Sequence, residues 1–478
     1  MSNEGCSRRE LLAKAGNGFG LVALASLLRQ EGLLANDEPR DPLAPRAPHF
    51  KARAKAVIWI FVNGGPSHVD TWDYKPELEK RDGQELPGFN KFTGFFANEV
   101  GGLMKSPFKF APQGRCGKRV SEIFPNLGKH VDRMAFIHSG WTESNNHSPA
   151  LFMMNSGETR MGHPCVGSWV TYGLGSESRN LPSFVVMSDP LGRGLPKGSA
   201  QNWGAGFLPS VYQGTYLKPS GAPIDNMAPP AELAGERQRR QLDLLRDLNG
   251  TRESDPAEKE LAARIESFEL AYRMQSAAPE AFELDKEPEH VRKLYGLDNK
   301  KCLHFAKQCL IARRMVERGV RFVQIYSGGM ENQLSWDGHK DIEGNHRGFA
   351  DETDQPVAAL ISDLAQRGLL DDTLIIWGGE FGRLPIAQKG GKPGRDHNPH
   401  AFTTWMAGGG VKGGVSYGAT DEVGFKAVEN RVSVHDLHAT ILHLMGLDDK
   451  KLTFRHNSLE QRLTTITVDA KVIKEILS

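Results

Sequence analysis

The residues from Thr373 to Phe402 read TLIIWGGEFGRLPIAQKGGKPGRDHNPHAF. The first part, Thr373–Trp377, is a short apolar run with β-branched residues, typical of a strand buried in a parallel sheet. It ends in two glycines and Glu380. In open α/β sheets, ligands gather at the carboxyl ends of the strands, because the loops that leave this edge project side chains into one crevice. The stretch therefore predicts a buried strand with a carboxylate at the ligand-binding edge of a sheet.

Two histidines follow Glu380 in the same stretch, within a Gly/Pro-rich segment that we expect to be a loop. His397 lies seventeen residues after Glu380, and His400 lies three residues further on. Carboxylate and imidazole groups brought together in this way suit a divalent metal ion. Glu380 could instead pair with Arg383 or Arg395, since a buried carboxylate needs a cation.

Strand and helix patterns alternate along most of the chain. Runs typical of buried strands occur at 56–62, 134–137, 182–187 and 321–326, and helical periodicity occurs at 231–248, 256–274, 302–318 and 353–366. A long irregular Gly/Pro-rich segment at 190–230 is expected to be an ordered excursion over the ligand-binding edge. The alternation predicts an α/β fold with a mostly parallel, doubly wound sheet and helices on both faces.

Composition limits the classes of partner. The chain has 478 residues, 39% of them hydrophobic and 24% charged, with a formal net charge of +1. These values are ordinary for a globular protein, and no basic run interleaved with aromatic residues points to nucleic acid. Five cysteines without CxxC spacing predict neither a disulfide framework nor a zinc cluster, and Cys302 and Cys309 are expected to pack in a core.

The N-terminal residues predict export. Arg8 and Arg9 stand directly before an apolar run at 16–28 that is too short to span a bilayer, a pattern typical of a twin-arginine (Tat) signal. We therefore expect a signal at 1–35, a Pro-rich linker at 36–55, and one α/β domain at 56–478 with a helical insertion at about 231–318. The Tat translocase would be a transient partner, and the protein would reach the periplasm or the extracellular space.

Six segments of the chain carry a resemblance to a known family. They are GGPSHVDTWDYKP from Gly64, NNHSPALFMMNSGE from Asn145, WDGH from Trp336, WGGEFGR from Trp377, GRDHNPHAF from Gly394 and HDLHATILHLMGLD from His435. They resemble the exported bacterial family filed as domain of unknown function 1501, which is itself similar to the alkaline phosphatase and sulfatase superfamily. The resemblance covers nearly all of the chain after the signal and implies the superfamily's α/β fold and a metal site.

Carried over position by position, the resemblance implies several ligands. Asn63 falls where the superfamily has its first metal-binding aspartate, and Glu380 falls where it has a later one. Asp337 and His339 resemble the ligands of a second metal, although the spacing is shorter. His397 matches the later lone histidine ligand, with His400 in reserve.

The same comparison implies a departure at the nucleophile position. His147 stands where sulfatases have the cysteine that becomes formylglycine, and Leu151 stands where they have a sulfate-binding arginine. His147 could ligate a metal, act as acid or base, or cap the helix expected from Ser148. Asp70 could hold a metal or could fix the turn before Pro76.

These observations lead to an expectation about function. We expect an exported hydrolase of phosphate or sulfate esters that uses one or two divalent ions, with zinc, manganese and calcium all open. Ser67, Ser148 or a water would attack, and Arg383 and Arg395 would hold the anionic group of a small ester or of a sulfated or phosphorylated glycan. The alternative is a metal-stabilised binding or envelope scaffold that has lost the nucleophile.

Overall fold

A nine-stranded sheet forms the centre of the part of the chain described by the computed structural model, which comprises residues 41–218, 223–224, 235–249 and 256–478. The predicted signal at 1–35 lies outside the described residues. The strands are β1 (Ala56–Val62), β5 (Met134–Trp141), β6 (Phe184–Met187), β7 (Thr215–Leu217), β8 (Phe322–Ser327), β9 (Thr373–Gly378), β12 (Phe402–Ala407), β13 (Val415–Tyr417) and β16 (Val432–Ser433).

The order of the sheet is β13-β5-β12-β9-β1-β8-β6-β7, and β16 also pairs with β5. Strand β12 is antiparallel to both β5 and β9, while the other pairings in this sheet are parallel. The carboxyl ends of β1, β5, β8 and β9 therefore share one edge. The predicted mostly parallel sheet is confirmed.

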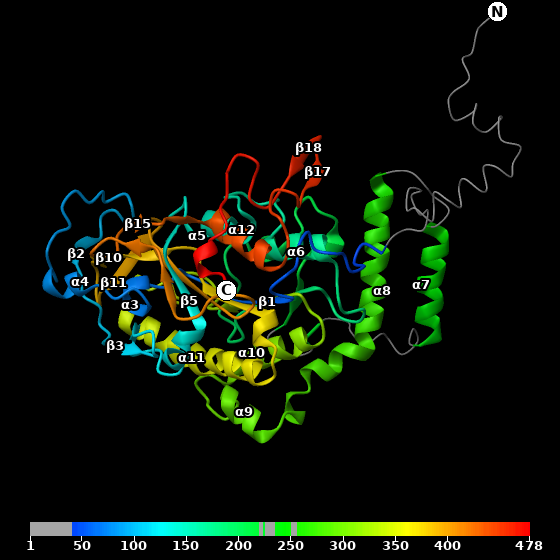
Figure 1. The fold of residues 1–478 in the computed structure, drawn as a ribbon, viewed down its shortest axis with the longest axis horizontal. Coiled ribbons are helices and arrows are strands. Elements are labelled where there is room, and N and C mark those ends of the chain that lie inside the picture. Colours follow the sequence, from blue (N-terminus) through cyan, green and yellow to red (C-terminus); the bar gives the residue numbers. More distant parts are fainter. Residues whose placement is uncertain (1–40, 219–222, 225–234, 250–255) are drawn as a thin grey trace, which may run out of the picture. The chain divides into compact units, whose positions relative to one another are not determined.

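Helices cover both faces of the sheet (Figure 1). One side carries α8 (Pro256–Phe282), α9 (Glu289–Tyr295), α10 (Leu303–Glu317) and α11 (Ile342–Gln366); the other carries α5 (His147–Ser156), α6 (Val166–Leu174) and α12 (Val434–Leu444). Alternate residues of β1 divide between the two cores. Ile58 and Ile60 pack with the first group, and Trp59 and Phe61 pack with the second. Burial on both faces explains the continuous apolar run that predicted this strand.

Further elements are shorter or lie beside the main sheet. They are α3 (His68–Thr71), α4 (Pro76–Lys80), α7 (Glu236–Asn249), the pairs β3 (Phe110–Gln113) with β4 (Lys118–Ser121), β14 (Ala419–Thr420) with β15 (Ala427–Glu429), and β17 (Phe454–His456) with β18 (Leu459–Gln461). Residues 42–55, within the expected linker, are held by backbone hydrogen bonds from Arg46 to Leu174 and from Arg53 to Leu444. No helix among the described residues is long and apolar enough to cross a membrane.

The Gly/Pro-rich segment after Glu380, for which the sequence predicts a loop, instead forms two strands of a separate small sheet. Strands β10 (Gly382–Gln388) and β11 (Gly394–Asn398) are antiparallel to each other, and β10 also pairs with β2 (Val100–Leu103). Charged residues occupy these strands, so local propensity gave no strand signal there. The small sheet carries Arg383 and His397 as a cross-strand pair at the ligand-binding edge of the main sheet.

Candidate metal centre

Four buried side chains converge at this edge. His147, Asp337, His339 and His397 each offer one ligand atom, and these atoms all lie within 4.8 Å of one another. His147 is the first residue of α5, and His397 lies on β11. Asp337 and His339 lie in the loop that follows β8. Three segments far apart in sequence therefore supply one cluster.

Two glycines allow these segments to approach one another. Gly64, in the turn after β1, has φ +101°, and a Cβ there would lie 2.5 Å from the backbone nitrogen of Asp337. Gly394, at the start of β11, would place a Cβ 2.0 Å from the backbone oxygen of His339. Both distances are shorter than any real Cβ contact, so only glycine permits this packing. The loop that carries Asp337 and His339 is thereby held between the β1 turn and β11.

His339 and His397 direct their Nε2 atoms at each other. The Nδ1 of His397 lies 2.6 Å from the backbone oxygen of Asn145, and the Nδ1 of His339 lies 2.7 Å from the Oε1 of Gln388. The Gln388 amide nitrogen donates to Glu99 at 2.5 Å, which fixes its oxygen toward His339. Both Nδ1 atoms therefore carry a proton, because both face an acceptor.

This tautomer leaves two imidazole lone pairs in contact. The two Nε2 atoms are 2.9 Å apart, and each also lies near Oδ1 of Asp337, at 2.9 Å for His339 and 3.3 Å for His397. Burial, followed by the charge of His147, lowers the pKa of His397 well below its ordinary value, so its ring is neutral. Facing lone pairs repel unless a cation lies between or beside them. The arrangement has the geometry of metal ligands whose Nδ1 protons are held by an outer ring of acceptors.

His147 completes the set. Its Nδ1 lies 2.8 Å from Oε1 of Glu380, and its Nε2 lies 3.3 Å from Oδ2 of Asp337 without hydrogen-bond alignment. Burial alone would lower the pKa of His147, but the nearby carboxylates of Asp337 and Glu380 outweigh burial and raise it to about 9. In the absence of an ion, Nε2 of His147 thus carries a proton. A metal ion would replace this proton, as metal binding to histidine ordinarily does.

Asp337 is the only carboxylate among the four ligand atoms. Burial favours its neutral form, but the charge of Arg383 and the neighbouring imidazoles outweigh burial and hold the pKa of Asp337 well below its usual range. Its Oδ1 accepts from Arg383 at 2.6 Å, and its Oδ2 accepts from the backbone nitrogen of Asn332 at 2.6 Å. A permanently ionised carboxylate beside three imidazoles is a donor set that fits a divalent ion.

Glu380, expected as a ligand, lies behind the cluster. It accepts from the backbone nitrogen of Gly64 at 3.0 Å and from His147, and it is fully buried. Within the described part of the chain, neither Arg383 nor Arg395 forms an ion pair with it. Its observed position is that of an orienting residue for His147. The side chain of Asn146 accepts from the backbone nitrogen of Ser148, so Asn146, not His147, caps α5.

Ser67, Asp70 and Arg395 form a separate buried network. Arg395 donates from Nε to Asp70 at 2.6 Å and from Nη2 at 3.0 Å, and Ser67 donates to the same carboxylate at 2.5 Å. All three side chains are fully buried. Asp70 is thus occupied by a guanidinium instead of a metal, and Ser67 is not available as a nucleophile.

Three other expected site residues lie outside the cluster. The amide of Asn63 donates to the backbone oxygen of Gly329. His400 is half-buried, and its ring packs against Phe425. Ser148, also half-buried, follows His147 directly on α5. Of these three, only Ser148 keeps a position from which it could act.

The anion-holding role expected of the two arginines does not fit this arrangement. Arg383 donates to the backbone oxygens of Gly64, Gly65 and Arg395 as well as to Asp337, and its side chain is fully buried. Arg395 is occupied by Asp70. Arg383 supports the cluster, Arg395 belongs to the separate network, and neither is free to hold a substrate.

A cavity of about 200 Å³ opens onto the cluster. It is lined by the aromatic rings of Phe95 and Phe96 and by Asn146, Glu331 and Asn332, together with the four clustered residues. No lysine or arginine lines it among the described residues. The sequence did not predict the roles of Phe95, Phe96, Asn145 and Gln388. These residues reach the site from distant segments, and Asn145 acts through its backbone oxygen, so none of them leaves a local sequence pattern.

Comparisons with known proteins give a family and distant structural similarity. The model of the family described as "Protein of unknown function (DUF1501)" matches residues 54–477. No curated protein matches.

Solved structures match at low similarity. PsFucS1 sulfatase from Pseudoalteromonas sp. is 13% identical, with 95% of this chain and 76% of that chain covered and a TM-score of 0.35. The phosphonate monoester hydrolase from Silicibacter pomeroyi is 10% identical, with 89% and 76% covered and a TM-score of 0.38. TAB5 alkaline phosphatase is 10% identical, with 83% and 99% covered and a TM-score of 0.36. At these scores the similarity assigns no activity to this chain.

Proposed function

The chain belongs to the DUF1501 family, whose description assigns no activity, and we propose from the site itself that it is an exported, metal-dependent hydrolase of phosphate or sulfate esters. The observation that carries the proposal is the convergence of three imidazole Nε2 atoms and the Asp337 carboxylate on one point. Their Nδ1 protons are held by Glu380, Gln388 and the backbone of Asn145. When bound, a divalent ion supplies Lewis-acid polarisation of an ester oxygen and lowers the pKa of water.

The charges around the cluster support an anionic substrate. The positive charge of Arg383 offsets one of the two carboxylates, Asp337 and Glu380, and the three histidines are neutral when they ligate. A divalent ion would leave the four ligands, Glu380 and Arg383 together with a net positive charge. The donor set favours zinc or manganese over calcium, which prefers six to eight oxygen ligands.

The chain's own residues would orient the reactants. Glu380 fixes the ring of His147, and Gln388 fixes the ring of His339, so the three Nε2 atoms need little reorganisation. Phe95 and Phe96 line the cavity and would give it an apolar wall. Ser148 and water are the candidate nucleophiles, since Ser67 is committed to Asp70.

A metal-stabilised scaffold without catalysis is the second candidate. The absence of lysine and arginine from the described cavity lining favours it, because phosphate and sulfate sites commonly use such side chains. Both candidates require the ion, and they differ in turnover.

One experiment separates the candidates. Purified protein is loaded with zinc or manganese, its metal content is measured by elemental analysis, and it is assayed with 4-nitrophenyl phosphate and 4-nitrophenyl sulfate. Turnover that is lost in His339→Ala but kept in His400→Ala supports the hydrolase. Stoichiometric metal without turnover of either ester supports the scaffold, and no bound metal in the wild type refutes both.

Export through the Tat pathway is a separate part of the proposal, based on Arg8 and Arg9 before the apolar run. The double variant Arg8→Lys with Arg9→Lys should remain in the cytoplasm as folded protein. Normal export of that variant in a fractionation experiment would remove the Tat assignment.

A further inference from the structure

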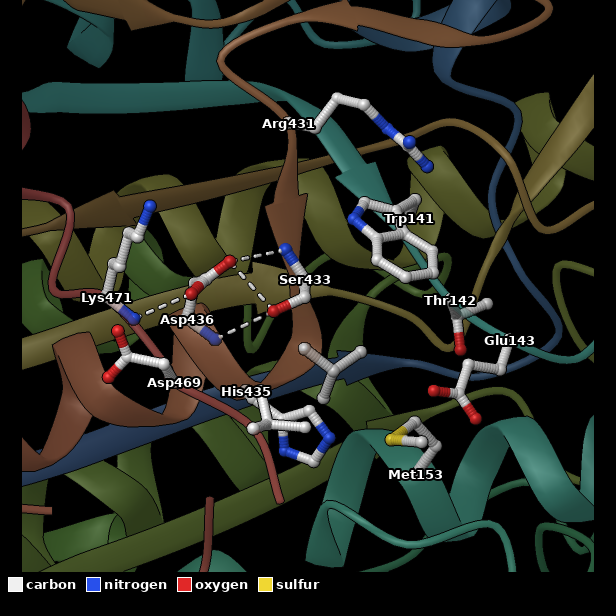
Figure 2. Close-up of a pocket in the computed structure, with 12 residues that line it drawn as sticks. Trp141, Thr142, Glu143, Met153, Arg431, Ser433, His435, Asp436, Asp469 and Lys471 are labelled. Carbon is white, nitrogen blue, oxygen red and sulfur yellow. Dashed lines mark hydrogen bonds between the residues drawn. The ribbon is translucent and has the colours of Figure 1, made fainter. Parts of the chain in front are cut away.

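A second cavity, of about 380 Å³, lies where β5 ends and α12 begins (Figure 2). The side chains that matter for its chemistry are Trp141, Thr142, Glu143, Arg431, His435 and Lys471. In Figure 2, Arg431 reaches toward Trp141, while Glu143, Met153 and His435 border the pocket on the other side of that ring. Its volume is within the range of about 300–1,000 Å³ usual for small-molecule sites.

Two buried polar groups in this pocket have no partner. Thr142 and His435 are 4% and 6% exposed, and neither the hydroxyl of Thr142 nor Nδ1 of His435 makes a hydrogen bond within the described residues. Buried polar groups are ordinarily paired, because an unpaired one costs free energy. Both unpaired atoms are shielded from solvent, so a polar ligand supplies the missing partners when these two side chains turn toward the pocket.

Other polar residues of the pocket are already used by the fold. Ser433 and Asp436 form a capping box at the start of α12, and Asp436 also accepts from the backbone nitrogen of Lys471. Asp469 pairs with Lys450 at 2.6 Å. The free groups are therefore Thr142, His435 and the exposed ends of Glu143, Arg431 and Lys471.

Trp141 is the one tryptophan of this chain that is not buried. The other seven, all among the described residues, are at most 3% exposed. The guanidinium of Arg431 lies 4.7 Å from the centroid of the Trp141 ring. A partly exposed indole within a concave, polar site offers a flat apolar surface for a ligand face.

We propose that this pocket binds a neutral saccharide. Sugar hydroxyls both donate and accept, and the pocket offers donors in Arg431 and Lys471, an acceptor in Glu143, and both functions in Thr142 and His435. The apolar C–H face of a sugar ring suits the indole of Trp141. The charges at the pocket balance when all of them are counted, three carboxylates (Glu143, Asp436, Asp469) against three cations (Arg431, Lys471 and Lys450, which pairs with Asp469). A strongly charged ligand therefore gains little from them.

The proposal is independent of the metal centre, although residues that line the two cavities are close in sequence. Trp141, Thr142 and Glu143 line the saccharide pocket, whereas Asn146 and His147 line the metal cavity. Sugar binding can therefore be measured whether or not the ion is present and whether or not an ester is hydrolysed.

Tryptophan fluorescence tests the proposal directly, because a collisional quencher reaches Trp141 before the seven buried indoles. The full chain is titrated with cellobiose, maltose, xylobiose, chitobiose and mannobiose, and acrylamide quenching is measured at each concentration. At least one disaccharide should protect the accessible fraction of the emission. Isothermal titration calorimetry should show its Kd weakened tenfold or more by Trp141→Ala and by His435→Ala, with Thr142→Val a milder variant that preserves shape.

The control is Phe92→Ala, which removes a 70% exposed aromatic ring that does not line the pocket and should leave the Kd unchanged. Thermal melts check that each variant folds. If Trp141→Ala does not fold, Thr142→Val is used in its place to test binding. The proposal is overturned if no disaccharide protects Trp141 or if binding persists unchanged in folded Trp141→Ala and Thr142→Val. It is also overturned if only acidic sugars, such as glucuronate or glucose 6-phosphate, bind.

Discussion

Replacing His339 with alanine is the most direct perturbation of the proposed metal centre. The substitution removes one of two Nε2 atoms that face each other at 2.9 Å, and it leaves the Asp337–Arg383 ion pair in place. Without an ion, loss of favourable contacts is partly offset by relief of lone-pair repulsion. With an ion, the variant loses a ligand.

The size of the effect follows from mass action. An ion present at 100 to 1,000 times its Kd stabilises the native state by about 2.7–4.1 kcal/mol. His339→Ala should therefore lower the free energy of unfolding by about 3 kcal/mol with the ion, and by about 1 kcal/mol or less under chelator. For a unit of this length, unfolding entropy converts 3 kcal/mol into a shift of about 3 °C in Tm.

The assay is a set of four melts, wild type and variant, each with zinc and with EDTA, accompanied by elemental analysis. Wild type should fall toward the variant in EDTA, and the variant should barely move. His400→Ala is the matched control, a half-buried histidine outside the cluster that should behave as wild type. Full metal occupancy and an undiminished EDTA shift in His339→Ala would refute the assignment of the ligands.

Three further predictions concern buried polar groups, one beside the cluster and two elsewhere in the fold. Gln388→Leu removes the acceptor for the Nδ1 proton of His339 and should weaken metal affinity by about 10 to 100-fold in a competition titration, whereas Gln308→Leu, a buried glutamine elsewhere, should not. Asp70→Asn leaves the guanidinium of Arg395 buried without its counter-charge and should cost about 3–5 kcal/mol in urea unfolding, with metal content unchanged. Burial lowers the pKa of His438 to about 3. As the pH falls, the unfolded chain therefore binds a proton at this histidine before the folded chain does. The stability that the neutral buried ring contributes is complete above pH 6.5 and is lost as the pH falls toward 3. At pH 5 the loss is about 2 kcal/mol, and His438→Gln should flatten the pH dependence of stability by that amount; an unchanged slope would contradict this account.

The main sheet could be predicted from the sequence because its strands are buried on both faces. The run 56–62 coincides with β1, and 373–377 falls one residue short of the end of β9. Strands β10 and β11 were missed, since residues such as Arg383 and His397 carry no strand propensity and their pairing depends on tertiary contacts.

Part of the candidate site could also be predicted, because the buried strands show where the edge of the sheet lies. Polar residues at strand ends pointed to one edge, and His147, Asp337, His339 and His397 do meet there. The sequence could not show which carboxylate would lie among the three histidines. Glu380 and Asp337 both follow strands, but only the fold places His147 between them.

The origin of the four ligands in three distant segments determines when an ion can be bound. Residues 147 and 337 are 190 positions apart, and bringing such distant points together in an unfolded chain carries a loop-closure entropy that local contacts cannot offset. The described cysteines are all free thiols, so no disulfide among them shortens the search. The ligand set is complete only after β8, β11 and α5 have taken their places around the sheet. Uptake of such an ion would thus be a late event that reports finished folding, and it would take place in the compartment in which the chain folds.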